Sequence, residues 1–271
     1  MAFVACATVV EAFDNVPESI SASISLKVPG NGAKHYPLTF QKSQNNNGTY
    51  YLENSEKMPL TVSQNIVTGN DGLRISVSIT ALEDVYFNYN QQMATGFRHD
   101  DCLFYMPGFW YRRNLRSPKE APSFHTSDSW LVREDRLSAP LTGIYSEKEK
   151  SFVTVSRIDN FANEVLSTHR EGEIILSGKT SIGFTGFENQ NGVATLSFGF
   201  PYREAPKSYI RKLTLAPAVE AFQSLKKGET MLLTWEIMEN KADEQQKDNY
   251  RSHYWNNRSN TLERCFYKCL K

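Results

Sequence analysis

Hydrophobic and polar residues alternate with a period of two along much of the chain. The clearest run covers residues 73–80, where Leu, Ile, Val and Ile alternate with Arg, Ser, Ser and Thr. The same alternation recurs at 23–28, 194–200 and 231–237. This pattern is typical of β-strands that bury one face and expose the other. Shorter runs of the same kind lie at 50–52, 85–89, 152–155, 173–176 and 182–187.

Turn-forming residues separate these runs and indicate an all-β protein. Gly and Asn cluster at 29–32, 45–48, 70–72 and 189–192, and such clusters favour tight connections between strands. About a dozen strands at this spacing predict a large antiparallel β-sandwich of the supersandwich type. An all-β barrel remains an alternative, whereas a parallel α/β fold is disfavoured because helical crossovers are missing between the runs.

Two stretches have helical patterns. From Pro217 to Leu225, a proline suited to a first helical position precedes apolar residues that would share one helical face, so we predict a short helix. At the C-terminus, the sequence from Asn260 to Glu263 resembles a capping box. Apolar residues then recur at helical spacing, which predicts an amphipathic tail helix; they are Leu262, Cys265, Phe266, Cys269 and Leu270.

These patterns divide the chain into three parts: a leader at 1–19, a β-supersandwich domain at 20–240, and a polar linker with an amphipathic helix at 241–271. The tail is either the truncated start of a helical domain or a helix that docks on its own sandwich. The leader is apolar and rich in small residues but lacks a positively charged start, so it is either a clipped signal peptide or an ordinary first strand.

The N-terminal sequence also suggests a destination. Residues Phe3 to Cys6 resemble the approach to a lipidated cysteine in bacterial lipoproteins. If translation starts upstream, the protein is exported to the periplasm or outer surface, with a lipid anchor as one form of that export.

Charge and cysteine content exclude several classes of partner. The chain has 30 Lys plus Arg and 30 Asp plus Glu, so it lacks the basic excess that binds a phosphate backbone and we expect no nucleic acid. No apolar run approaches the ~18 residues of a transmembrane helix. The four cysteines form no C-x-x-C pair and no metal-ligand spacing, so we predict buried or free thiols, no metal and no cofactor.

The segment from Phe97 to Arg136 is dense in aromatic and charged residues. Aromatic faces beside Arg, Asn and Asp suit a sugar, since its C–H faces stack on rings while planar polar groups bond its hydroxyls. The candidate substrate-binding residues are Trp110, Tyr111, Arg112, Asn114, His125, Asp128 and Trp130. The alternative is that the aromatic residues pack in the core and the Arg residues form surface ion pairs.

No catalytic residue can be assigned from motifs. The chain contains no G-x-S-x-G elbow, no H-E-x-x-H motif and no Gly-rich phosphate loop. The pair of carboxylates that a glycosidase uses is defined by separation in space, which a sequence does not give. Whether the chain is an enzyme therefore stays undecided at this level.

Three short stretches carry a resemblance to a known group of proteins. They are Met106-Pro-Gly-Phe-Trp-Tyr-Arg-Arg-Asn114, Ser127-Asp-Ser-Trp130 and Arg133-Glu-Asp-Arg136. With them, the region from Ile20 to Asn240 resembles the N-terminal β-supersandwich of exported Bacteroidetes carbohydrate-active proteins, in which a six-hairpin α-barrel follows.

The resemblance implies a carbohydrate-associated domain, the N-terminal part of a glycoside hydrolase or lyase-like protein that acts on oligo- or polysaccharide. In such proteins the catalytic acids usually lie in or near the helical barrel, and the sandwich loops shape the sugar subsites. The alternative is a complete, non-enzymatic periplasmic or surface protein that binds a glycan or another protein.

Overall fold

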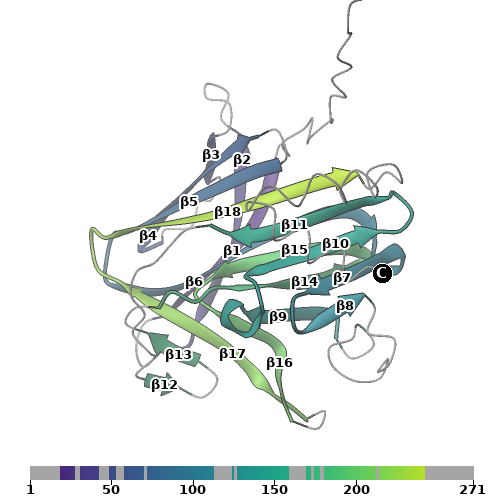
Figure 1. Cartoon of the computed structure of the whole chain (residues 1–271). Coiled ribbons are helices and arrows are strands. Elements are labelled where there is room, and N and C mark those ends of the chain that lie inside the picture. The colour runs from purple at the N-terminus through teal and green to yellow at the C-terminus, as the bar shows by residue number, and fades with distance from the viewer. Residues whose placement is uncertain are drawn as a thin grey trace, which may run out of the picture.

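The computed structural model is built from β-strands (Figure 1). It describes residues 19–27, 31–42, 49–52, 58–69, 72–112, 124, 127–158, 169–171, 174–177, 180–211 and 214–241. The leader up to residue 18 and almost all of the predicted linker and tail helix lie outside these residues.

The first half of the described chain contains nine strands. They are β1 (Ser19–Lys27), β2 (Lys34–Lys42), β3 (Thr49–Leu52), β4 (Leu60–Thr68), β5 (Gly72–Ala81), β6 (Val85–Arg98), β7 (Cys102–Met106), β8 (Trp110–Arg112) and β9 (Ser129–Arg133). A 3-10 turn, η1 (His99–Asp101), joins β6 to β7, and a second, η2 (Glu134–Arg136), follows β9.

The second half contributes the other nine. They are β10 (Leu141–Ser146), β11 (Ser151–Arg157), β12 (His169–Glu171), β13 (Ile174–Ser177), β14 (Phe184–Gln190), β15 (Val193–Phe200), β16 (Arg203–Arg211), β17 (Thr214–Leu225) and β18 (Thr230–Lys241). The predicted all-β class is confirmed, and among the described strands only β13 and β17 pair in parallel.

Two groups of strands form layers that pack face to face. The first layer runs β5-β18-β11-β10-β7-β8, and the second runs β1-β6-β15-β14-β9. In Figure 1 the strands β18, β11, β10 and β7 cross the view together with β15 and β14. Strands β2, β3 and β4 connect the two layers at one side, because β1 pairs with β2 and β4 pairs with β5.

Large aromatic rings fill the space between the layers. Trp235 of β18 stacks on Tyr89 of β6 with ring centroids 6.1 Å apart, and Phe198 of β15 lies 5.4 Å from the same indole. Phe104 of β7 lies 5.1 Å from Phe187 of β14. The Tyr, Trp and Phe positions of the alternating runs therefore supply the core.

Six strands close into a ring next to this core. Strand β6 pairs with β15, β15 with β14, β14 with β9, β9 with β16, β16 with β17, and β17 returns to β6. The ring closes at the start of β6, where residues 85–87 pair with 223–225.

The helix predicted from Pro217 to Leu225 is wrong, since this stretch belongs to strand β17. Ala221, Phe222 and Gln223 are all buried in succession, so both faces of the strand are covered and the period-two signal disappears. Pro217 is accommodated beside an irregularity in the pairing with β16, where a missing N–H is tolerated.

Within the stretch from Phe109 to Asn114, residues 110–112 form strand β8. Trp110 pairs with Met106 and Tyr111 with Tyr105, so β7 and β8 form a hairpin. Gly108 makes the turn with a φ of 82°, a backbone conformation that favours glycine. Cys102, at the start of β7, is a buried thiol that donates to the carbonyl of Arg98, as predicted for the cysteines.

Candidate functional site

The second layer has a polar face on the side turned away from the core. Residues opposite one another in adjacent strands project to the same face, and the register places Ser21, Gln92 and Ser197 in one row and Ser23 and Asn90 in the next. We call this surface the polar face. Its polar side chains are Ser21, Ser23 and Ser25 of β1, Asn88, Asn90 and Gln92 of β6, Thr195 and Ser197 of β15, Glu188 of β14, and Ser129 and Arg133 of β9.

Exposure increases along the polar face from one end of β6 to the other. Asn88 and Asn90 are buried near the end where the ring closes, whereas Gln92 is half-buried and Ala94 is exposed. Asn88 Nδ2 donates to the carbonyls of Pro201 and Ala221 at 3.0 and 2.7 Å, so the chain around β16 and β17 covers this end. Further along β6, Thr195 and Ser197 of the neighbouring β15 are 0% exposed, so the reachable half of this face is limited to the half-buried side chains of Gln92, Glu188 and Gln190.

Hydrogen bonds hold the reachable half in a fixed arrangement. Glu188 Oε2 accepts from Gln92 Nε2 at 2.7 Å and from Gln190 Nε2 at 3.1 Å. Deeper in the face, Ser197 Oγ donates to Asn90 Oδ1 at 3.0 Å. Because their positions are set before any ligand arrives, these groups lose little freedom on binding one.

Two glycines interrupt the rows of the polar face. A Cβ at Gly186 would lie 1.9 Å from the carbonyl oxygen of Trp130, and one at Gly199 would lie 2.0 Å from that of Tyr89. Neither position tolerates a side chain, because the neighbouring strand's backbone approaches too closely. At Gly199 the ring of Phe184 on the paired strand also occupies this space, 2.6 Å from the position of the added Cβ.

One predicted binding residue lies at the edge of this face. Asp128 is exposed and its Oδ1 accepts from Asn189 Nδ2 at 3.1 Å, while the backbone N–H of Asn189 donates to the Asp128 carbonyl. The next residue, Ser129, pairs with Glu188 and lies on the polar face.

The two predicted tryptophans lie in the core. Trp110 and Trp130 are each 1% exposed, and their rings meet edge to face with centroids 6.1 Å apart. Phe187 and Phe124 complete the cluster around the Trp110 indole at 5.9 and 4.9 Å. Trp110 and Trp130 therefore pack in the core, which is the alternative to sugar stacking that the sequence left open.

The structure describes the other predicted residues only in part. Tyr111 and Arg112 belong to strand β8, but their side chains lie outside the described part. Asn114 and His125 fall wholly outside the described residues. Sugar contacts by these four residues stay a prediction.

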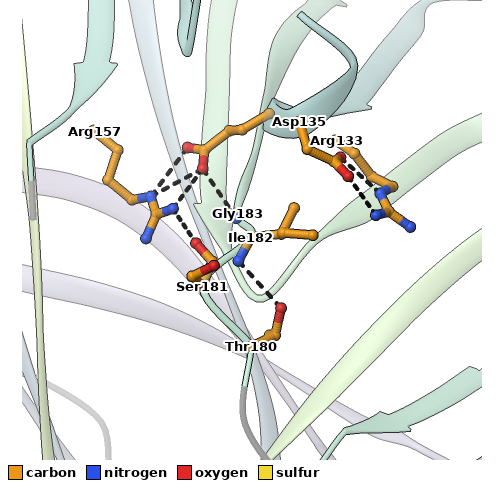
Figure 2. A network of polar contacts seen from close by, with 8 residues as sticks. Arg133, Asp135, Arg157, Thr180, Ser181, Ile182 and Gly183 are labelled. Atoms are coloured by element: carbon orange, nitrogen blue, oxygen red, sulfur yellow. Dashed lines mark hydrogen bonds and ion pairs between the residues drawn. The ribbon is translucent and has the colours of Figure 1, made fainter. Parts of the chain in front are cut away.

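A second polar cluster lies at η2, around the Arg133-Glu-Asp-Arg136 stretch (Figure 2). The Arg157 guanidinium binds Glu134 with two nitrogens, Nε at 3.0 Å and Nη2 at 2.7 Å from Oε2, and Nη2 also donates to the carbonyl of Ser181. The Gly183 N–H donates to the same carboxylate at 3.0 Å. Since Arg157 ends β11 and Glu134 follows β9, this pair connects the two layers.

Each remaining charged residue of this stretch also has a partner. Arg133 forms two hydrogen bonds with Asp135, at 2.9 and 2.6 Å, and its guanidinium lies over the Tyr202 ring at 4.3 Å. Arg136 pairs with the buried carboxylate of Glu204 at 2.9 Å. Figure 2 shows Arg133 and Asp135 turned toward each other, apart from Arg157 and Ser181.

Burial sets the protonation behaviour of Glu134. Its side chain is 7% exposed, and loss of hydration raises the pKa of this carboxyl above its usual range. The Arg157 charge and the hydrogen bonds from Arg157 and Gly183 oppose that rise without cancelling it. The cluster is enclosed between the layers and joined by hydrogen bonds from both of them, so it is suited to holding the layers together.

The chemistry available on the polar face is hydrogen bonding by neutral amides, hydroxyls, the Glu188 carboxylate and the Arg133 guanidinium. Within the described ranges, no three His, Cys, Asp or Glu side chains gather closely enough to hold a metal ion. Over the same residues, no helix has the length and hydropathy of a membrane span.

Sequence reasoning missed the polar face because its residues are common in ordinary strands. Ser21, Ser23 and Ser25 fill the polar positions of an alternating run, which the pattern assigns to solvent. A signal was present in Asn88-Tyr-Asn-Gln-Gln92, where polar residues occupy consecutive positions of a strand and so fall on both faces.

Comparison with known proteins gives distant structural likenesses alone. No protein-family model and no curated protein matches the chain. The Slr1438 protein from Synechocystis sp. PCC 6803 is 11% identical with a TM-score of 0.41, and the match covers 76% of this chain and 66% of that protein.

Two other solved structures are of proteins whose names include a sugar. The GH36 alpha-galactosidase AgaB from Geobacillus stearothermophilus is 9% identical with a TM-score of 0.47, covering 84% of this chain and 30% of that enzyme. A galactose mutarotase-like protein from Clostridium acetobutylicum is 10% identical with a TM-score of 0.40, covering 83% of this chain and 79% of that protein. The chain thus spans less than a third of the length of the alpha-galactosidase.

Proposed function

We propose that this chain is a carbohydrate-associated β-supersandwich domain whose polar face binds an oligo- or polysaccharide. The observation that carries the proposal is the hydrogen-bonded group of Gln92, Glu188 and Gln190 at the reachable half of the polar face. Sugars offer many hydroxyls that both donate and accept, and side-chain amides and carboxylates match them with planar, directional groups.

The division of roles within this group is clear from its chemistry. Glu188 accepts and cannot donate when ionised, whereas each glutamine amide offers donors and an acceptor. A vicinal pair of sugar hydroxyls can donate to the carboxylate and accept from the Gln92 amide at the same time. Ser23 and Ser129, both half-buried on the same face, extend the polar surface on either side.

The sequence resemblance supports the same substrate class and suggests the larger context. We extend the proposal to a glycoside hydrolase or lyase-like protein in which a helical barrel follows the sandwich and holds the catalytic acids. Export to the periplasm or outer surface belongs to the same proposal, because polysaccharides are encountered there. In this arrangement the chain holds the glycan and does not itself break a bond.

A glycan array followed by calorimetric titration tests the proposal. We expect a ligand whose affinity falls by tenfold or more in Glu188→Gln and in Gln92→Ala, because a hydrogen bond to a charged group contributes about 1.5–3 kcal/mol. The control is Glu236→Gln, a carboxylate on the exposed side of β18 that pairs with Arg74. Binding that is equally strong in all three variants, or no glycan ligand at all, would contradict the proposal.

A further inference from the structure

A second group of apolar side chains lies on the side of the first layer that faces away from the core. Tyr105, Leu141 and Phe152 form a cluster separate from the main core, and Ala139 and Tyr145 pack against it. They alternate with core residues: Phe104 and Met106 flank Tyr105, and Val153 follows Phe152. We call these five residues the outer patch.

The outer patch is buried although it points outward. Tyr105, Leu141 and Phe152 are 4%, 3% and 1% exposed. On the same side of the same layer, Leu232 of β18 is 58% exposed, and Val67 of the adjoining β4 is 55% exposed. One half of this side is therefore covered and the other half is open.

The described strands around the outer patch lie beside it or beneath it. Strand β10 is flanked by β7 and β11 in its own layer, and it contacts β14 and β15 of the second layer through the core. Thr142 Oγ1 of β10 meets Thr185 Oγ1 of β14 at 2.6 Å, which fixes that side of β10 as the inner one. Because these exposed fractions are those of the single chain, the cover for the outer side comes from a part of the same chain other than these strands.

The described chain ends next to this patch. Lys241 of β18 pairs with Ser151 of β11, one residue before Phe152, and Asn240 pairs directly with Phe152. The following 30 residues, 242–271, begin at that point with a polar stretch and end with the predicted apolar stripe. About 20 residues separate Lys241 from Leu262, which can span far more than the ~15–20 Å width of the three strands.

We propose that residues 242–271 cover the outer patch, with the stripe Leu262, Cys265, Phe266, Cys269 and Leu270 packed against Tyr105, Leu141 and Phe152. The stripe supplies apolar surface of the width that an amphipathic helix buries, and the patch supplies the apolar surface it requires. Gly143, which lies between Tyr105 and Thr154 in the paired strands, carries no side chain to hold a helix away.

A double-mutant cycle in the full 271-residue chain tests the docking. Phe266→Ala and Tyr145→Ala are made singly and together, and the urea midpoint of each variant is measured. We expect each single change to lower the midpoint and the double change to lower it by less than their sum, because residues in contact share the loss. Tyr267→Ala, one residue off the stripe, is the control and should combine additively with Tyr145→Ala.

Hydrogen exchange gives a second measurement on Phe266→Ala, with Tyr267→Ala as its control. The amides of residues 141–146 should exchange faster in Phe266→Ala than in Tyr267→Ala, since the cover over β10 is loosened. Additive effects with unchanged exchange would overturn the proposal. If Tyr145 is coupled to Phe161 and not to Phe266, residues 159–168 cover the outer patch. If the urea midpoint rises with protein concentration, a second copy of the chain covers it. Either result also overturns the proposal.

Discussion

Trp110 shows how one residue can be recognised as important without its role being predictable. The same letters, an aromatic pair followed by Arg, Arg and Asn, describe both a sugar-binding loop and a core hairpin. What decides between them is the pairing of β8 with β7, which turns the indole toward Trp130 and Phe187. That pairing is a tertiary fact, so no local pattern contains it.

The packing of Trp110 leads to a measurable expectation. Trp110→Ala should lower the free energy of unfolding by about 3–5 kcal/mol, because it empties a fully enclosed site among four aromatic rings. Urea unfolding followed by circular dichroism measures this loss. Leu232→Ala is the control: its side chain is 58% exposed, so it should change stability by less than about 0.5 kcal/mol. A loss below 1 kcal/mol for Trp110→Ala would show that the indole is not a core residue.

At the scale of single elements, strands with one solvent-exposed face were predictable and strands with two buried faces were not. The run at 73–80 lies within β5, whose burial alternates along its length, as the sequence pattern requires. Strand β17 pairs with β16, β13 and β6 and is covered on both sides, so its residues satisfy a helical pattern equally well. The polar face could not be predicted either, because the sequence does not distinguish buried polar residues from solvated ones.

The turn at 189–192 was predictable because its chemistry is local. The cluster at 189–192 forms the hairpin between β14 and β15, with Asn191 at φ 53° and Gly192 at φ 83°. Two consecutive positive φ angles characterise the type I′ turn, for which Asn-Gly is a preferred pair. Here the sequence predicts both the position and the geometry.

Gly192→Ala isolates the contribution of that geometry. An added Cβ at Gly192 meets no atom within 4 Å, so the substitution introduces only the cost of a left-handed backbone in an L-residue, about 1–2 kcal/mol. Gly32→Ala is a matched control, since a Cβ there also meets open space and its φ is not positive. Equal urea midpoints for the two variants would contradict a left-handed Gly192.

For the whole molecule, the contact between layers combines apolar packing with one buried ion pair. The rings of Tyr89, Trp235 and Phe198 bury apolar surface between the layers. Glu134 and Arg157 fix the position of one layer relative to the other, because a bidentate pair has one good geometry. Arg157 was not singled out from the sequence, since it lies at the end of an ordinary alternating strand, and Glu134 was named only as part of the Arg133-Glu-Asp-Arg136 stretch.

The same pair makes the stability of the whole fold depend on pH in a defined direction. Burial raises the pKa of Glu134 in the folded state above its value in the unfolded chain. The folded state therefore holds this proton more tightly, so the resulting stabilisation is complete below the ordinary glutamate pKa and is lost as pH rises through the raised value. Unfolding free energies measured from pH 4 to pH 7 should contain this downward component.

Glu134→Gln identifies the source of that component. The amide keeps the size of the side chain but cannot titrate, so the difference in unfolding free energy between the original chain and Glu134→Gln should shrink as pH rises across this window. Glu236→Gln, an exposed carboxylate on β18, should leave the pH profile parallel to that of the original chain. A difference that instead grows with pH would mean that the Arg157 charge outweighs burial and that the pKa of Glu134 is lowered in the folded protein.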